Sequence, residues 1–220
     1  YTEAMTLNNQ GVAMIEAGNY ANARSTFKKA LSHMKSNVQG VSRKRQLNDG
    51  ESAVSFRWSS NTPLPAERSH LDSSVGSTFV YRRSLLIIPA KFHGKDDCYP
   101  ETAAILYNLS LSFHIEGHLT NNSTMLEKAM RAYNVALTIR RRRQVCRKLH
   151  TSDRLVDVAI TNNMAMIHQE FMEFDKARSC FARMSRGLRS LGNSGFLEQI
   201  EYQGLVLNLM MGRQNQNTLA

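Results

Sequence analysis

The sequence predicts an all-α protein made of antiparallel helical hairpins, and three observations support this prediction. Three stretches of the 220-residue chain repeat one pattern of small, aromatic and aliphatic residues. Hydrophobic residues make up 42% of the chain, which is ordinary for a folded domain. The apolar run at residues 85–88 is far too short to cross a bilayer, and no other run in the chain is long enough. The repeated positions are Leu7, Gly11, Gly18, Tyr20, Ala23, Phe27, Ala30 and Leu31, then Ser110, Gly117, Leu119, Ala129, Tyr133, Ala136 and Leu137, then Ala165, Phe174, Ala177 and Phe181.

Two small residues and one aromatic residue in each stretch predict a pair of closely packed helices. In the first stretch, Gly11 and Ala23 would let the two helices cross at short range. Phe27 comes four residues after Ala23, one helical turn on, and would fill the space beneath the crossing. Gly18 and Gly117 suit the turn that ends a first helix, because glycine adopts a left-handed conformation at the least cost.

This pattern resembles the tetratricopeptide repeat, and residues 7–31 match that repeat well. The second and third stretches diverge from it. Ser110 replaces the usual small Gly or Ala, Met172 stands where the turn glycine is expected, and Met184 replaces the last alanine. The resemblance implies that the hairpins stack side by side as a TPR-like α-solenoid with a concave surface.

The hairpins are unevenly spaced, so the chain must contain insertions. The first small residues stand at positions 11, 110 and 165, whereas typical repeats recur about every 34 residues. We expect the turn of the second hairpin to carry an insertion at 120–123, and its second helix to run through Arg140 towards Leu149. The expected segments are hairpins at 1–35, 99–149 and 153–190, an inserted loop at 36–98, and a C-terminal capping helix at 195–212 with a polar face early in it.

The inserted loop contains two pieces that the sequence predicts to be extended, at 53–58 and 78–88. Val54, Phe56 and Trp58 alternate with polar residues, and the second piece is rich in β-branched and aromatic residues. A lone strand leaves its backbone groups unpaired, so we expect the two pieces to form a short two-stranded ribbon beside the helices. A competing hypothesis is that one piece lies in the protein's own groove as a mimic of a peptide ligand.

Three asparagines are the candidate peptide-binding residues. Asn9, Asn108 and Asn163 each come two residues before the first small residue of a stretch, so equivalent side chains would point the same way from successive helices. A primary amide can both donate to and accept from a peptide backbone. The arrangement is similar to the groove of kinesin light chains, which implies peptide binding there. The alternative is that these amides form hydrogen bonds between neighbouring helices.

Charge supports a second hypothesis, in which the protein binds RNA or another polyanion. The chain has 28 Lys and Arg against 18 Asp and Glu, a formal net charge of +10. An acidic protein partner would suit the same charges, and a solvated helix end is the structural alternative. The candidate contact residues are Arg140, Arg141, Arg142, Arg143, Arg147 and Lys148.

The sequence favours no enzyme, no cofactor and no metal site, and so no catalytic residues are predicted. His114 and His118 lie one helical turn apart, but Glu116 between them does not give the H-E-x-x-H zinc pattern. We expect each histidine to be a surface or capping residue. Three cysteines without regular spacing favour a reducing compartment.

The sequence therefore predicts a non-catalytic scaffold for protein–protein interaction that binds a peptide or helix in a concave helical groove. Nucleic acid is the alternative partner, and neither a membrane nor a small-molecule substrate is expected. We expect an intracellular location, in the cytoplasm or nucleus, and the start at Tyr1 leaves room for a preceding targeting segment.

Overall fold

The computed structural model describes residues 2–40, 54–59, 80–89, 99–144, 151–191 and 197–214. Most of these residues are helical, which confirms the all-α prediction. In chain order the elements are α1 (Thr2–Glu16), α2 (Tyr20–Gly40), β1 (Val54–Trp58), β2 (Leu85–Pro89), α3 (Tyr99–Leu119), α4 (Ser123–Gln144), α5 (Thr151–Glu170), α6 (Phe174–Leu191) and α7 (Gln199–Gln214).

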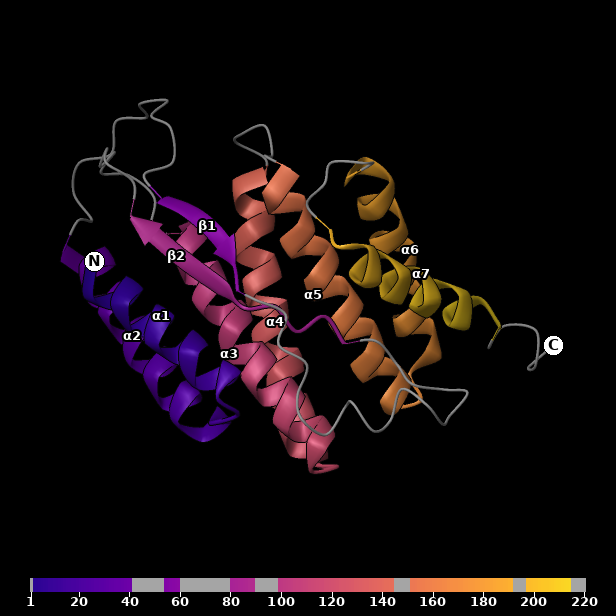
Figure 1. Cartoon of the computed structure of the whole chain (residues 1–220), viewed down its shortest axis with the longest axis horizontal. Helices are drawn as coiled ribbons and strands as arrows, with labels where there is room; N and C mark the ends of the chain where they lie inside the picture. The colour runs from indigo at the N-terminus through magenta and orange to yellow at the C-terminus, as the bar shows by residue number, and fades with distance from the viewer. Residues whose placement is uncertain are drawn as a thin grey trace. The chain divides into compact units, whose positions relative to one another are not determined.

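The elements belong to two compact units, which we describe separately. Unit 1 contains α1 to α4 and both strands, and unit 2 contains α5 to α7 together with Val80 and Tyr81. In unit 1, α1 packs on α2, α2 on α3 and α3 on α4, so two hairpins lie side by side. In unit 2, α5 packs on α6 and α6 on α7. Figure 1 shows the helices and strands of each unit.

The three hairpins share one turn geometry. Their turn residues with positive φ are Gly18 at 74°, Asn121 at 49° and Met172 at 57°. The residue after each one donates its N–H to a carbonyl five positions earlier, the bond that marks a Schellman turn at a helix C-terminus. These bonds are Asn19 to Met14 at 2.8 Å, Asn122 to Gly117 at 2.8 Å, and Glu173 to His168 at 2.8 Å.

The expected insertion in the turn of the second hairpin is wrong. Ser110 precedes the left-handed Asn121 by eleven positions, whereas Gly11 precedes Gly18 by seven. On the other side, Ala129 follows Asn121 by eight positions and Ala23 follows Gly18 by five. The additional four and three residues are about one helical turn each, so both helices of the hairpin are longer and the turn stays short.

Gly117 therefore does not end α3, contrary to the prediction. It lies inside this helix, which continues to Leu119. A Cβ built on Gly117 would come within 2.9 Å of Leu126 Cδ2. The residue is thus needed for the close approach of α3 and α4, and Asn121 takes the role in the turn.

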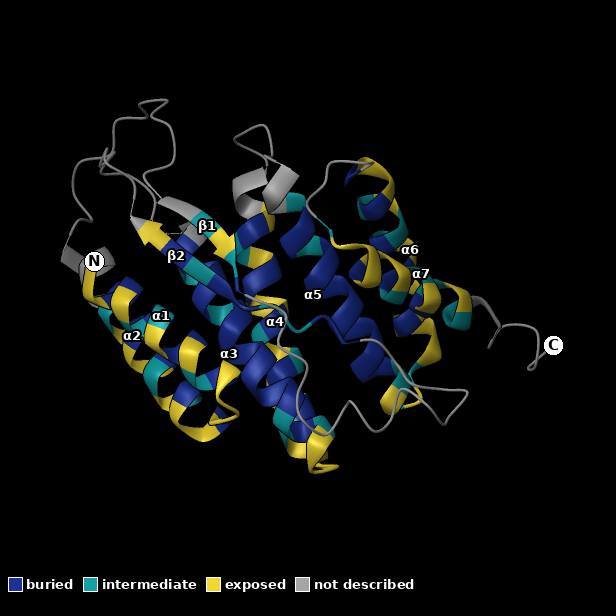
Figure 2. Ribbon diagram, in the orientation of Figure 1, coloured by how far each residue is buried: buried dark blue, intermediate teal, exposed yellow. Residues whose placement is uncertain are grey.

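The predicted contact between small and aromatic residues is present in the first hairpin. A Cβ on Gly11 would lie 2.5 Å from Phe27 Cε1, so only a glycine leaves room for this ring. Phe27 and Tyr133 are fully buried, and Phe181 is 5% exposed. Figure 2 shows α3 coloured as buried along most of its length, which makes this helix the centre of unit 1.

A polar contact joins the two hairpins of unit 1. Arg24 on α2 forms an ion pair with Glu116 on α3. The same guanidinium lies 5.0 Å from the centroid of the Phe113 ring, within the range of a cation–π contact. Side chains that are far apart in the sequence thus fix how α2 packs on α3.

The expected two-stranded ribbon is present, because β1 pairs with β2 in antiparallel register. Phe56 lies opposite Ile87, and Trp58 opposite Leu85. Ser59 extends the pairing by donating its N–H to the Ser84 carbonyl at 2.8 Å. Figure 1 shows β2 beside α1 and α3, with β1 on its other side.

The helix ends differ from the predicted bounds. Helix α2 continues to Gly40, so the inserted segment begins within a helix, and residues 80–84 precede β2 without regular secondary structure. Helix α7 is less polar outside than expected: Gln199 and Gln203 are exposed, but so are Ile200, Leu207 and Met210. Glu201 is instead fully buried, and its Oε2 accepts the Glu198 N–H at 2.9 Å, which is the bond that the fourth residue of a capping box makes.

Candidate peptide-binding site

Asn9 on α1 binds the main chain of β2 with both polar atoms of its amide. Its Nδ2 donates to the Ile87 carbonyl at 2.9 Å, and its Oδ1 accepts the Ile87 N–H at 2.9 Å. A second backbone strand would form this same pair of bonds with a residue on the edge of a sheet. Asn9 therefore acts as a short substitute for a neighbouring strand.

Asn108 on α3 repeats this contact two residues earlier in β2. Its Oδ1 accepts the Leu85 N–H at 2.8 Å, and its Nδ2 donates to the Leu85 carbonyl at 2.8 Å. Asn8 donates to the same carbonyl at 2.9 Å, and its Oδ1 accepts from Asn108 Nδ2 at 2.9 Å. Asn8 and Asn108 are fully buried, so these bonds form away from water and saturate the Leu85 main chain.

The strand pattern explains why the asparagines meet Leu85 and Ile87 and not their neighbours. In a strand, the N–H and C=O groups of successive residues point to opposite edges. Leu85 and Ile87 direct theirs to the amides of α1 and α3. Ser84 directs its carbonyl to the opposite edge, where it accepts from Ser59, the residue that follows β1. The β2 main chain is thus bound on one edge by a strand and on the other by side-chain amides.

The side chains of β2 divide in the same alternating way. Leu85 is 1% exposed and Ile87 is fully buried, whereas Leu86 is half-buried and Ile88 is 39% exposed. The two residues that the asparagines bind are therefore also the two that anchor the strand in the apolar core of unit 1.

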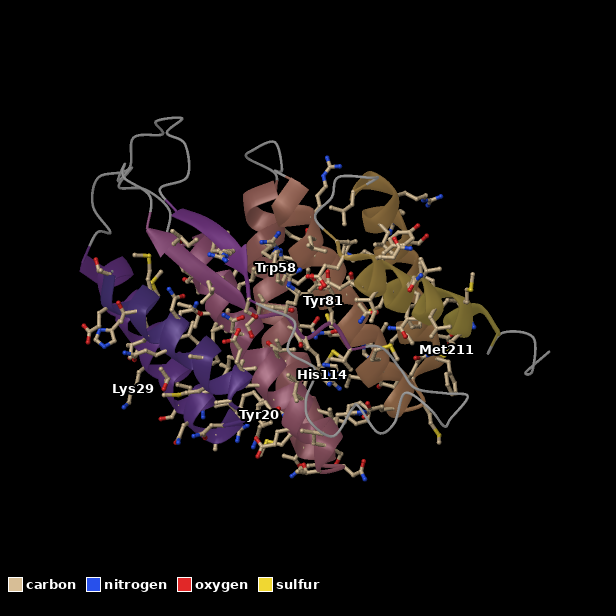
Figure 3. The ribbon with its side chains drawn as sticks, viewed as in Figure 1. Tyr20, Lys29, Trp58, Tyr81, His114 and Met211 are labelled. Carbon is tan, nitrogen blue, oxygen red and sulfur yellow. The ribbon has the colours of Figure 1, made fainter. Side chains whose placement is uncertain are left out.

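Aromatic side chains connect the ribbon to the helices beneath it. Trp58, labelled in Figure 3 at the end of β1, meets Tyr107 on α3 edge to face at 5.9 Å between ring centroids. The Tyr107 hydroxyl donates to the Arg83 carbonyl at 2.8 Å, and its ring lies 6.1 Å from that of Tyr133 on α4. The ribbon is thus bound by side chains at its end as well as along its edge.

Unit 2 contains a third contact of the same kind. Asn163 on α5 accepts the Tyr81 N–H at 2.8 Å and donates to the Tyr81 carbonyl at 2.9 Å. Asn162 donates to Asn163 Oδ1 at 3.1 Å and accepts from Asn208 on α7 at 2.7 Å. Asn8, Asn9 and Asn108 of unit 1 have this same set of mutual bonds. Asn208 therefore donates to Asn162 in unit 2 in the same way as Asn108 donates to Asn8 in unit 1.

The sequence interpretation missed three of these asparagines, Asn8, Asn162 and Asn208. The doublets at 8–9 and 162–163 were a usable signal, because both end two residues before a small residue. Asn208 has no such neighbour. Its role depends on a bond to a residue 46 positions away, which no local pattern reveals.

The contacts include both kinds of bond that the sequence suggested for the three asparagines, namely bonds to an extended main chain and bonds between neighbouring helices. Asn108 bonds to Asn8 on a neighbouring helix of unit 1, as the structural alternative requires. Each of Asn9, Asn108 and Asn163 also binds main chain, and this main chain belongs to the second extended piece of the inserted segment. The second extended piece thus occupies the three amides on which the peptide-binding hypothesis depends.

His114 on α3 is fully buried, so the expectation of a surface or capping histidine is wrong for this residue. Neither of its ring nitrogens has a hydrogen-bond partner among the described residues, and its ring meets Tyr133 edge to face at 6.1 Å. Burial, and to a smaller extent the charges of His118 and Arg82, lower the pKa of His114 to about 3. The imidazole, labelled in Figure 3, is neutral and serves as an aromatic core residue.

The structure describes the side chains of Arg140 and Arg141 from the predicted basic cluster, and one of the two is buried. Arg140 is only 7% exposed, so it is not part of an exposed patch, whereas Arg141 is exposed at the end of α4. The side chains of Arg142 and Arg143 and the whole of Arg147 and Lys148 lie outside the described residues.

The described ranges are 2–40, 54–59, 80–89, 99–144, 151–191 and 197–214. In them, no three His, Cys, Asp or Glu side chains lie close enough together to hold a metal ion. Within the same ranges, none of the helices combines the length and the apolar character that crossing a bilayer requires. Comparison with family models, curated proteins and solved structures finds no match to this chain.

Proposed function

We propose that this protein is a non-catalytic interaction module that binds an extended polypeptide segment through asparagines on the first helices of its hairpins. One observation carries the proposal: three asparagines on three different helices each form a donor and an acceptor bond with the main chain of a single residue. Amides in this arrangement read the backbone rather than the side chain, so they suit a peptide of varied sequence.

The proposal includes a tetratricopeptide-like α-solenoid as the scaffold. It is supported by the repeated Schellman turns at Gly18, Asn121 and Met172, and by the close contact of Gly11 with Phe27. In such an array the first helices line the concave surface, and the asparagines lie on the first helices α1, α3 and α5. In unit 1 the amide contacts of α1 and α3 would then follow one another along the binding surface.

Polyanion binding has weaker support. The net charge of +10 favours it, but Arg140 is buried and only Arg141 of the predicted contacts is described as exposed. We therefore propose a protein or peptide partner in the first place.

Affinity capture from a cell lysate, followed by mass spectrometry, tests the proposed function. The comparison is made in the Leu85→Pro/Ile87→Pro background, because in the wild-type chain Asn9→Ala would weaken the binding of β2 and of a partner alike. In that background Asn9→Ala removes one pair of main-chain bonds to the partner, and we expect it to lower the recovery of the captured partners by about fivefold or more, which corresponds to the loss of about 1 kcal/mol. Asn134→Ala is the matched control, because Asn134 is an exposed helical asparagine that bonds only to its own helix. Equal recovery with the background variant and with its Asn9→Ala form, both with unchanged circular dichroism, would refute the proposed function.

A further inference from the structure

We infer that the ligand of this site is a strand-forming peptide with branched aliphatic residues at positions i and i+2, which takes the place of β2 beside β1. The inference rests on the proposed function and adds the class of ligand and the competitor that the ligand must displace. That competitor is the chain's own segment, with Leu85 at position i and Ile87 at position i+2.

The contacts of β2 define what such a ligand must offer. It needs a free N–H and C=O at both anchor positions, because Asn108 and Asn9 each use both groups. Proline is thereby excluded at i and i+2. The two anchor side chains must be aliphatic, since Leu85 and Ile87 are almost completely buried.

The positions between and beyond the anchors are less restricted. Leu86 is half-buried and Ile88 is 39% exposed, so polar or larger residues fit there. The ligand must also be extended over this length, because β1 binds its other edge through Ser59 and the register of β1 with β2. These requirements describe a β-strand, and they exclude a helical ligand.

The internal segment competes because it presents the same groups at a high effective concentration. A segment that is tethered by a short, flexible connection competes as strongly as a free ligand at millimolar concentration. A two-stranded ribbon is not stable alone, so β1 and β2 depend on the helices for their order. When the bound segment opens in a minor state of about 0.1–10%, the apparent affinity for an external peptide falls by about 10- to 1,000-fold.

Peptide binding to a variant with a weakened internal strand tests the inference. The probe is a fluorescent peptide with the sequence of residues 80–89, VYRRSLLIIP. In the full-length double variant Leu85→Pro/Ile87→Pro, both N–H groups that the asparagines accept are removed. We expect this variant to bind the probe at least tenfold more tightly than wild type. Leu86→Ala is the control, because it leaves both main-chain contacts in place.

A second pair of measurements keeps the result specific to the site. A probe with proline at the positions of Leu85 and Ile87 should bind at least tenfold more weakly to the double variant. Adding Asn9→Ala to the double variant should also remove most of its gain in affinity, because Asn9 would then no longer bind the peptide main chain.

Hydrogen exchange on the wild-type chain tests the opening of β2 without any substitution. We expect the Leu85 and Ile87 amides to exchange through a local opening that needs less free energy than that of the α3 core. Exchange of these two amides only by global unfolding would overturn the inference, as would loss of the helical circular dichroism signal in the double variant. Both results would make β2 a permanent part of the fold.

Equal affinity of wild type and a folded double variant for the probe would also overturn the inference. If the probe binds to neither chain while capture from lysate still depends on Asn9, the ligand class is wrong and the proposed function stands. If Asn9→Ala leaves the capture by the double variant unchanged, the proposed function itself is wrong.

Discussion

Replacement of Asn108 by alanine should destabilise the protein strongly, since this side chain completes several buried bonds. In Asn108→Ala the Leu85 N–H loses its acceptor and Asn8 Oδ1 loses the donor described here, whereas the Leu85 carbonyl keeps its bond from Asn8. Each polar group that is left buried without a partner costs about 1–3 kcal/mol. The expected loss of unfolding free energy is therefore about 2–6 kcal/mol, a large part of the roughly 5–15 kcal/mol of a typical domain.

Urea denaturation followed by circular dichroism measures this loss, with Asn134→Ala as the control. Asn134 is exposed, and its amide bonds only to the Met130 carbonyl of its own helix, so its removal should change the unfolding free energy by less than about 0.5 kcal/mol. A loss for Asn108→Ala below about 1 kcal/mol, or equal to that of the control, would show that the buried bonds of Asn108 do not form.

Three further predictions concern the core and the charged end of α4. The pKa of His114 is lowered to about 3 in the folded protein, so the unfolded chain binds more protons between pH 6.5 and 3. The free energy of unfolding should therefore decrease as the pH is lowered from 6.5 to 3, by about 1.4 kcal/mol per pH unit. In urea titrations at several pH values, His114→Phe should flatten this slope, and an unchanged slope would contradict the burial of the imidazole. Gly11→Ala should lower the free energy of unfolding by about 1–3 kcal/mol in the same assay, since its Cβ would lie 2.5 Å from Phe27. The double variant Gly11→Ala/Phe27→Leu should lose less than the sum of the losses of the two single variants. Strict additivity of the two losses would argue against the contact. If Arg141 contacts phosphates, affinity for generic RNA should fall steeply between low and moderate salt and Arg141→Ala should reduce the slope by about one; a flat salt dependence would exclude the polyanion alternative.

The parts of the fold that depend on local spacing could be predicted from the sequence. Gly11, Ala23 and Phe27 follow one another at helical intervals, and this short pattern contains the geometry of the first hairpin. The two extended pieces were likewise visible in the alternation around Phe56 and in the β-branched run that ends at Ile88. In these cases the residues that define the element are close together in the chain.

The path of the second hairpin could not be predicted, because additional residues can lengthen either a turn or the helices. Four residues before Asn121 and three after it add about one turn to each helix, and the register of the small residues is thereby kept. The sequence suggested Gly117 as the turn residue because glycine adopts positive φ at the least cost. In the structure Asn121 adopts it, and Gly117 serves a close contact with Leu126.

The contacts of the candidate site were only partly predictable. The spacing of Asn9, Asn108 and Asn163 relative to the small residues identified amides that bind main chain, but the bonds reach Ile87, Leu85 and Tyr81 at separations of 78, 23 and 82 positions. Such pairing depends on how an inserted segment returns to the helices, which no local periodicity encodes. The burial of His114 and Arg140 likewise depends on tertiary packing, which the local sequence does not reveal.

Residue-resolved hydrogen exchange in single asparagine variants is the most direct test of main-chain recognition by these amides. Each strand amide has its own acceptor, Asn9 for the Ile87 N–H and Asn108 for the Leu85 N–H. The exchange of Ile87 should therefore accelerate more than that of Leu85 in Asn9→Ala, and the order should reverse in Asn108→Ala. If the two amides accelerate by the same factor in both variants, or do not accelerate in either, the result would contradict the account.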